Sequence, residues 1–236
     1  PRDRDVVVYL GYDMLHLNQY DDLLKLTSEY NSILPKEADI PLLAGYAHKH
    51  FGQSELATRD FTEAIPRDPN VETAYVNRGY MLNDLHTPDA AALDFETALK
   101  QDPNDGQAHL GLAYSSLDLH KPGVALHQAD LAERTMGDIR DVHVIRATAY
   151  GRQNLYGKAA KEYRDALRFT PNDGALHLGL GNALFAERRY HSAIDELQVA
   201  QKYAPENPQI YATMARAYAN LDNKPETLRY INLAEQ

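Results

Sequence analysis

Apolar and small residues recur at helical spacing in two stretches within every 34 residues of the chain. Spacings of three, four and seven residues put such side chains on one face of an α-helix, so each stretch predicts an amphipathic helix. Helix-start and turn signals, such as Thr87-Pro88 and Asp102-Pro103, separate the stretches. In one unit the spacing is seen in Tyr75, Gly79 and Leu82 and then in Ala91, Phe95 and Ala98.

The whole pattern returns with a period of 34 residues. Pro69, Pro103, Pro171 and Pro205 are 34, 68 and 34 residues apart, and Gly137 occupies the skipped position. A fixed period of this length is typical of solenoids built from repeated helix pairs. The register defines seven units, namely residues 4–37, 38–71, 72–105, 106–139, 140–173, 174–207 and 208–236.

Columns of small residues and one column of bulky residues run through these units. Small side chains allow helix backbones to approach closely, and we expect the bulky side chains to fill the space that the small ones leave. The eighth place of each unit holds Gly11, Gly45, Gly79, Ala113, Ala147, Gly181 and Ala215. Further small columns include Ala57, Ala91, Ala125, Ala159 and Ala193, and Ala64, Ala98, Ala132, Ala166, Ala200 and Ala234. The bulky column consists of Phe61, Phe95, Tyr163 and Leu197.

These columns resemble the signature of the tetratricopeptide repeat, in which aromatic, Leu, Gly, Tyr, Ala, Phe, Ala and Pro residues stand at fixed offsets. Residues 72–103 and 140–171 match it most closely, and the resemblance covers essentially the whole chain. It implies an all-α fold of bacterial type: a right-handed α-α superhelix, a solenoid of antiparallel helix pairs, forming one domain over residues 1–236. The first unit has Leu23 and Tyr30 where small residues are expected, so we expect its helix pair to pack atypically.

A binding face is predicted on the first helix of each unit, because stacked repeats generate an extended concave surface there. The second, fifth, ninth and thirteenth places point away from the buried side of that helix. Aliphatic residues fill most of the fifth places, and these either line a groove or pack adjacent first helices. Tyrosine, which is common among residues that dominate binding energy, either lines the groove or covers the aliphatic residues as a structural rim. The tyrosines at the ninth place are Tyr12, Tyr46, Tyr80 and Tyr114.

We predict that a protein or peptide with apolar side chains, and without strong acidic character, lies along this tyrosine column in an extended or helical form. A clamp of Lys and Asn for a terminal carboxylate, known from chaperone-binding members of the family, is not expected because Val8 and Val76 stand at two of its places. The predicted polar contacts of the groove are Asn77, Arg152, Asn182 and Arg216.

Composition and charge narrow the function mainly by exclusion. Hydrophobic residues make up 44% of the chain and charged residues 25%, as in folded proteins, and no run approaches the roughly 18 to 20 apolar residues of a membrane span. The absence of Cys excludes disulfides and thiolate metal sites. A formal charge of −10 disfavours nucleic acid and anionic lipid. We expect no nucleic-acid partner and no direct membrane insertion, and both the cytoplasm and the periplasm stay open as locations.

No residue set predicts catalysis, a cofactor or a metal site. His109, His143 and His177 recur at one repeat spacing, but neighbouring helices lie about 8 to 10 Å apart, too far for these side chains to share one zinc ion. The chain is therefore predicted not to be an enzyme. The alternative is the regulatory or recognition domain of a larger enzyme, such as a membrane peptidase or glycosyltransferase. Self-association through the last predicted helix is a further expectation, because no following helix covers Leu228 and Ile231.

Overall fold

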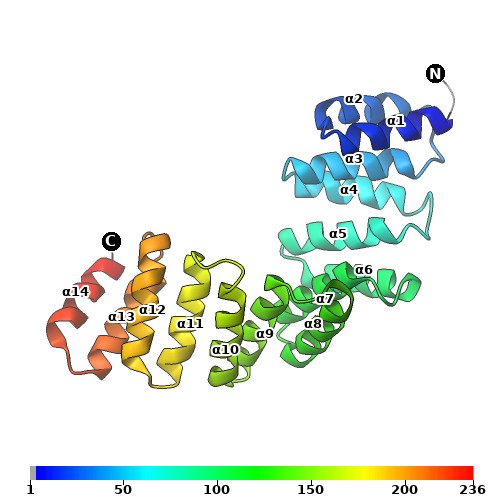
Figure 1. Cartoon of the computed structure of the whole chain (residues 1–236). Helices are drawn as coiled ribbons and strands as arrows, with labels where there is room; N and C mark the ends of the chain where they lie inside the picture. Colours follow the sequence, from blue (N-terminus) through cyan, green and yellow to red (C-terminus); the bar gives the residue numbers. More distant parts are fainter. Residues whose placement is uncertain (1–3, 236) are drawn as a thin grey trace. The chain divides into compact units, whose positions relative to one another are not determined.

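The computed structural model describes residues 4–235, which form fourteen α-helices joined by short turns and no strand (Figure 1). The predicted all-α fold of consecutive helix pairs is therefore confirmed. In the first half the helices are α1 Arg4–His16, α2 Tyr20–Tyr30, α3 Asp39–His50, α4 Ser54–Ala64, α5 Glu72–Asp84, α6 Pro88–Gln101 and α7 Gly106–Asp118. In the second half they are α8 Pro122–Met136, α9 Arg140–Arg152, α10 Tyr156–Leu167, α11 Gly174–Ala186, α12 Tyr190–Tyr203, α13 Pro208–Asn220 and α14 Lys224–Ala234.

The helices group into two compact units, Pro1–Leu119 and His120–Gln236. Within each unit the second helix of one repeat packs against the first helix of the next, as α4 does on α5 and α10 on α11. This contact is the one that a stack of 34-residue repeats requires. A single domain over residues 1–236 stays a prediction.

Each first helix is followed by a residue with left-handed backbone conformation. Gly52 has a φ of 67°, and the non-glycine residues at the same place have φ values between 55° and 62°. In this conformation, backbone N–H groups at the helix end hydrogen-bond to the last carbonyl groups of the helix. The chain also turns back there, so that the second helix runs antiparallel to the first. The non-glycine residues are Asn18, His86, His120, Asn154, Arg188 and Asp222.

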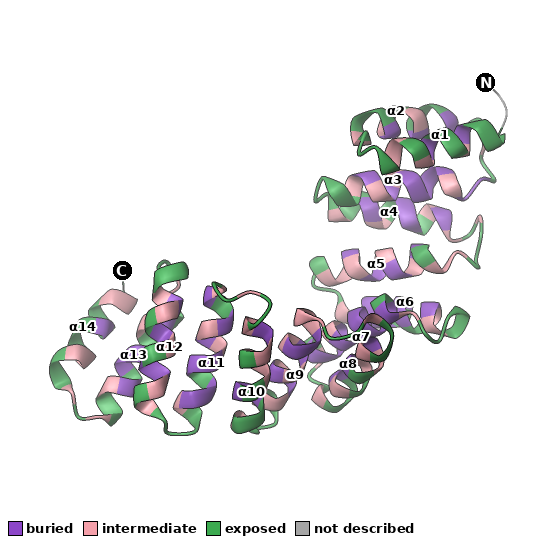
Figure 2. Ribbon diagram, viewed as in Figure 1, coloured by how far each residue is buried: buried purple, intermediate pink, exposed green. Residues whose placement is uncertain are grey.

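The core lies where the predicted small and bulky columns meet, as the band of buried residues in Figure 2 shows. A Cβ atom added to Gly45 would lie 2.5 Å from the Phe61 ring, and one added to Gly181 would lie 2.8 Å from Leu197. Such contacts are too close for any side chain, so glycine is needed where these bulky residues insert. The predicted pairing of small and bulky residues is confirmed.

The first repeat packs differently, as its sequence predicts. Leu23 and Tyr30 are buried at places that hold small residues in later repeats. Gly11 is approached by Leu43 of the following repeat, whereas Gly45 is approached by Phe61 of its own repeat. The first helix pair therefore builds its core partly from the repeat that follows it.

Candidate peptide-binding face

The tyrosines of the ninth place link consecutive first helices through their hydroxyl groups. Tyr12 on α1 donates to the Asp39 carboxylate on α3 over 2.5 Å, and Tyr80 on α5 donates to the Gln107 carbonyl on α7 over 2.8 Å. The Tyr46 hydroxyl on α3 likewise interacts with the Thr73 side chain on α5. In each case a ninth place reaches the second place of the next repeat. We call Tyr12, Tyr46 and Tyr80 the tyrosine ladder.

The environments of Tyr12 and Tyr46 keep their hydroxyl groups protonated. Burial raises the pKa of Tyr12 above its ordinary value, and the hydrogen bond to Asp39 raises it further. Burial likewise raises the pKa of Tyr46. The rings are half-buried, and those of Tyr46 and Tyr80 stand edge-on to Phe61 and Phe95 at centroid distances of 5.7 and 5.2 Å. Their inner sides therefore belong to the core and their outer sides to the surface.

Tyr114, the fourth predicted tyrosine, is half-buried on α7 and also has an interaction partner. The neighbouring aliphatic column differs from the tyrosines, because Leu42, Val76, Leu110 and Leu178 are all buried. These side chains pack between adjacent helices. Their burial favours the packing interpretation of the fifth place over the groove interpretation.

A hollow of about 430 Å³ opens beside the ladder, on the first helices α3, α5 and α7. One side of it is formed by Lys49, Asn77 and Tyr80: the Lys49 ammonium donates to Asn77 over 2.7 Å and lies 5.7 Å from the centre of the Tyr80 ring. An ammonium group above a ring face is attracted by the π-electrons. Val76, which is buried, also lines the hollow. The hollow thus brings together two predicted site residues, Asn77 and Tyr80.

Carboxylates also line this hollow. Burial raises the pKa of Glu72 to about 7, and nearby Asp105 and Asp102 raise it because a second negative charge there is unfavourable. Asp105 itself caps α7, since its side chain accepts from the Gln107 backbone N–H over 2.8 Å. The lining of the hollow therefore combines a cation, an amide and acids with the aliphatic side chain of Val76.

The second unit has a hollow of about 610 Å³ on α11 and α13. It contains two predicted residues: Asn182, which accepts a hydrogen bond from Thr213 over 3.0 Å, and Arg216, whose guanidinium lies 4.7 Å from the Phe185 ring centre. Arg152 is exposed at the end of α9 and does not line this hollow. The structure thus groups two of the three residues predicted for this half of the chain.

Residues of the twelfth place also line the two hollows, although they are not among the residues predicted from the sequence. Lys49 and Phe185 both stand at this place. Helical spacing could have predicted these residues, because the twelfth place follows the ninth by three residues and so lies on the same helix face.

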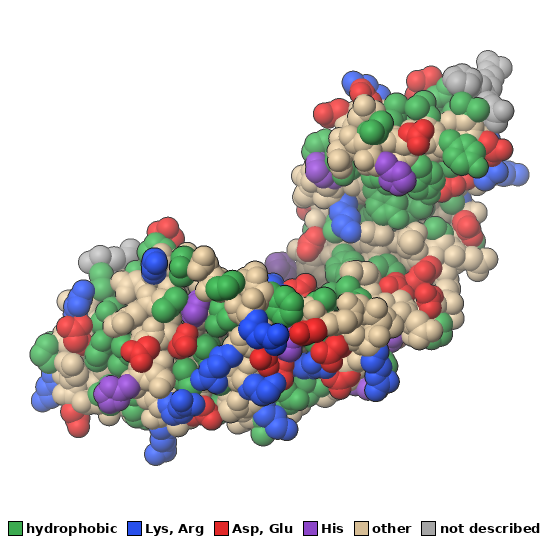
Figure 3. All heavy atoms as spheres, viewed as in Figure 1, with side chains coloured by type: hydrophobic (Ala, Val, Ile, Leu, Met, Phe, Trp, Pro, Cys, Tyr) green, Lys and Arg blue, Asp and Glu red, His purple; other side chains and the backbone are tan. Residues whose placement is uncertain are grey.

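The two units differ in charge. Residues 1–119 contain 20 acidic and 9 basic residues, a formal charge of −11, whereas residues 120–236 contain 14 acidic and 15 basic residues. Basic side chains gather over the α9 to α11 part of the second unit (Figure 3). A partner that contacts the first unit therefore meets a strongly negative field.

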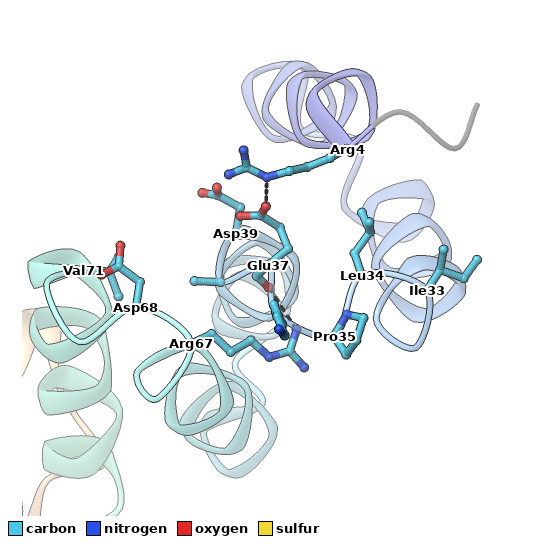
Figure 4. Close-up of a pocket in the computed structure, with 11 residues that line it drawn as sticks. Arg4, Ile33, Leu34, Pro35, Glu37, Asp39, Arg67, Asp68 and Val71 are labelled. Carbon is cyan, nitrogen blue, oxygen red and sulfur yellow. Dashed lines mark hydrogen bonds and ion pairs between the residues drawn. The ribbon is translucent and has the colours of Figure 1, made fainter.

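The turns between the first three repeats enclose a further hollow of about 590 Å³ (Figure 4). An ion pair between Arg4 and Glu37 closes one side, and Arg67 donates to the Glu37 carbonyl over 2.9 Å. Both arginines of the hollow are therefore engaged by Glu37. We interpret this hollow as a structural junction of loops.

The histidines of the fourth place are hydrogen-bonded within their own repeat and to the turn that precedes it. His143 on α9 bonds to Glu162 through Nδ1 and to Asp138 through Nε2, both over 2.7 Å. His177 on α11 makes the same type of contact to Glu196, over 2.8 Å. The ligand atoms of His143, Glu162 and Asp165 also lie within 4.8 Å of one another, but both His143 nitrogens are already hydrogen-bonded to carboxylates.

We expect a pH-dependent contribution of His143 to stability. Burial lowers its pKa, but the hydrogen bonds to Glu162 and Asp138 outweigh burial, so that the net pKa is raised above 6.5. A raised pKa stabilises the folded state below pH 6.5, and this stabilisation is lost as the pH rises through the folded-state pKa. His143→Gln is therefore expected to lower the free energy of unfolding by about 1–2 kcal/mol at about pH 5.5 and by less at about pH 8.5.

Urea denaturation at the two pH values measures this difference. His191→Gln, at an exposed position on α12, serves as the control and is expected to show no such dependence. A cost of His143→Gln that grows with pH would contradict the assignment.

The last helix, α14, exposes Leu228 and Ile231. Self-association through these two residues stays a prediction. Its test is the mass of the protein by light scattering as a function of concentration.

Stacked pairs of antiparallel helices that bury small residues against bulky ones define the class of helical repeat scaffolds. Two tetratricopeptide repeat models match the chain, over residues 84–138 and 152–217, together just over half of its length. The chain belongs to the tetratricopeptide repeat proteins. Members of this family generally act as scaffolds for protein–protein interaction and are generally non-catalytic.

The similar proteins extend this assignment at the level of the fold. Over 93 residues the chain is 29% identical to bacteriophage adsorption protein A of Escherichia coli (strain K12), a segment that is 39% of this chain and 9% of that protein. The chain thus spans a small part of that relative's length.

Two solved structures are similar to the chain at low sequence identity. One is the APC/C hetero-tetramer Cut9–Hcn1, with a TM-score of 0.75 and 15% identity over 98% of this chain and 46% of that one. The other is YrrB, described as a tetratricopeptide repeat protein with an unusual peptide-binding site, with a TM-score of 0.61 and 18% identity over 74% and 90%.

Among residues 4–235, no helix combines the length and the apolar character needed to cross a membrane.

Proposed function

We propose that the chain is a protein-interaction scaffold that binds an extended peptide segment along the first helices of residues 1–119. The observation that carries the proposal is the hollow beside the tyrosine ladder, where Val76, Asn77 and Tyr80 meet. Apolar side chains of the partner lie on the ladder rings. Its polar groups meet Lys49 and Asn77, and Asn182 and Arg216 serve polar contacts in the second unit.

The construction of the ladder supports a binding role. Tyr12 and Tyr80 are fixed at both ends, by their own helix and by a hydrogen bond to the next one. A ring held in this way loses little conformational entropy when a partner covers it. Rigid aromatic side chains whose outer sides are accessible are typical of surfaces that dominate binding energy.

Replacing Tyr46 and Tyr80 together by Ala is expected to weaken binding of a protein partner by about 2 kcal/mol or more, which is roughly thirtyfold in Kd. The physical reason is the loss of two ring surfaces from the centre of the face. The partner is recovered by pull-down with the intact chain, and its affinity is then measured by calorimetry with the purified pair.

Tyr46→Phe combined with Tyr80→Phe is the matched control, because it keeps both rings and removes only the hydroxyl groups that bond to Thr73 and Gln107. It is expected to retain most of the affinity. If the folded double Ala variant binds the partner with unchanged affinity, the proposed binding along the tyrosine ladder is wrong.

A second candidate function is the recognition part of a longer polypeptide, as in the alternative of a larger enzyme. The observation that favours it is the match to a relative of which only 9% is covered. The length of the encoding gene, and a catalytic motif within it, would decide between the two.

A further inference from the structure

An arginine at the seventh place of a repeat fills a pocket between three helices. Arg78 on α5 forms a two-pronged ion pair with Asp94 on α6, through Nε and Nη2, each over 2.7 Å. Its Nη1 donates to the Thr62 hydroxyl of α4 over 3.1 Å. Asp94 is only 6% exposed, so the guanidinium neutralises a buried carboxylate.

The seventh place of the fifth repeat also holds an arginine that binds acceptors on a neighbouring helix. Arg146 on α9 donates to Asp130 and Glu133, both on α8, the second helix of the preceding repeat. The partners of the two arginines show which places in the repeat supply the acceptors of this pocket. Asp94 stands at the twenty-third place of the same repeat, and the other acceptors stand at the twenty-fifth and twenty-eighth places of the preceding repeat.

The second repeat has the pocket but lacks the arginine. Its seventh place is Ala44, and its fourth place, where Tyr75 or His143 stands in other repeats, is Pro41. A hollow of about 580 Å³ lies here between α2, α3 and α4. The three acceptor places are retained, and all three residues line the hollow: Asp60, Ser28 and Asn31.

Two of these residues, Asn31 and Asp60, have an oxygen atom that can accept a further hydrogen bond. The Asn31 Oδ1 atom is buried and accepts no hydrogen bond, while its Nδ2 donates to Glu63 over 2.9 Å. Asp60 is 5% exposed; His48 occupies its Oδ2, whereas its Oδ1 is contacted at 3.4 Å by Arg59, whose side chain is 66% exposed. A buried acceptor without a donor is costly, so a guest that carries donors is favoured here.

We propose that the pocket between α2, α3 and α4 binds the guanidinium group of an arginine side chain supplied by a protein partner. A guanidinium has donors only and a planar fork that fits a carboxylate, and the chain already holds two of its own arginines at the equivalent place. The formal charge of −11 of residues 1–119 attracts a cationic segment. Lysine fits less well, because its ammonium lacks the planar fork.

This site is separate from the tyrosine face. Ala44 and Tyr46 are two residues apart on α3 and therefore point in different directions around the helix. The proposed guanidinium site can therefore be tested independently of the peptide groove.

The probe for the test is Nα-acetyl-arginine methylamide, with the matched citrulline compound as a neutral analogue of the same shape. Titration of the full chain, followed by NMR of the Asn31 side-chain amide and the Ala44 backbone amide, is expected to show saturable binding of the arginine compound. We expect the citrulline compound to bind at least about tenfold more weakly, because it lacks the charge. Equal response to the two compounds would overturn the proposal.

Ala44→Arg places a guanidinium in the pocket from within and is expected to weaken probe binding by at least about tenfold. Ser28→Asp supplies a carboxylate at the place that Asp130 fills for Arg146 and keeps the hydrogen bond from Asn31 to Glu63, so it is expected to tighten binding several-fold. Because Ser28→Asp tests the site in the opposite direction, it remains decisive if Ala44→Arg fails to fold. Unaltered affinity in either folded variant would contradict the assignment.

Discussion

Replacing Phe95 by Ala is expected to lower the free energy of unfolding by about 3–5 kcal/mol. The Phe95 ring is fully buried on α6, between the backbones of α5 and α7: Cβ atoms added to Gly79 and Gly111 would lie 2.8 and 2.3 Å from it. Helix backbones this close cannot shift further to fill the space, so the substitution leaves a cavity. The Tyr80 ring, 5.2 Å away, also loses its edge-on neighbour.

Leu93→Ala is the matched control, because Leu93 lies on the same helix and is 63% exposed. It is expected to change stability by less than about 0.5 kcal/mol. Since repeat stacks can unfold in parts, urea denaturation is combined with hydrogen exchange, in which α5, α6 and α7 are expected to lose protection. A loss of less than about 1 kcal/mol for Phe95→Ala would show that the ring is not the centre of this packing.

The helices and the main core contacts could be predicted from the sequence because both depend on local spacing. A side chain at the eighth place of one helix and one at the bulky place of the next are related by the fixed length of the repeat. Gly45 with Phe61 and Gly181 with Leu197 could therefore be paired from their positions in the repeat alone. The left-handed turn residues were missed, although Gly, Asn, Asp and His, which favour this conformation, hold six of the seven places and only Arg188 gives no such signal.

The binding face was predicted in part. The ninth-place tyrosines could be placed on an outward face from the helical period alone. That the Tyr12 and Tyr80 hydroxyl groups reach Asp39 and Gln107 depends on how far one repeat is rotated against the next, and the sequence carries no simple signal for that angle. Arg152 does not line the hollow of Asn182 and Arg216 because it stands at the end of α9, whereas the hollow lies on α11 and α13.

The pocket at Ala44 was also outside the reach of helical periodicity. Its recognition requires the acceptors of a neighbouring arginine to be known first, and these come from two different helices. Arg78 shows the acceptors Asp94 and Thr62, and only then do Asp60 and Ser28 stand out as their counterparts one repeat earlier.

Replacing Arg78 by Ala is expected to lower the free energy of unfolding by about 3–5 kcal/mol, the usual cost of removing one partner of a buried ion pair. The cost arises because Asp94, 6% exposed, would keep a negative charge without a counter-charge and would lose two hydrogen bonds of 2.7 Å. Thermal and urea denaturation of the full chain measure the effect.

The double variant Arg78→Ala with Asp94→Ala distinguishes this cause from a simple loss of packing. Without the carboxylate there is no uncompensated charge, so the double variant is expected to be more stable than Arg78→Ala alone. Arg78→Ala also recreates in the third repeat the pocket that Ala44 leaves in the second. Added Nα-acetyl-arginine methylamide is therefore expected to restore part of the lost stability to the single variant and none to the double variant, since a ligand stabilises only the folded state that binds it. A single variant as stable as the wild type would show that the Arg78–Asp94 pair contributes little to the third repeat.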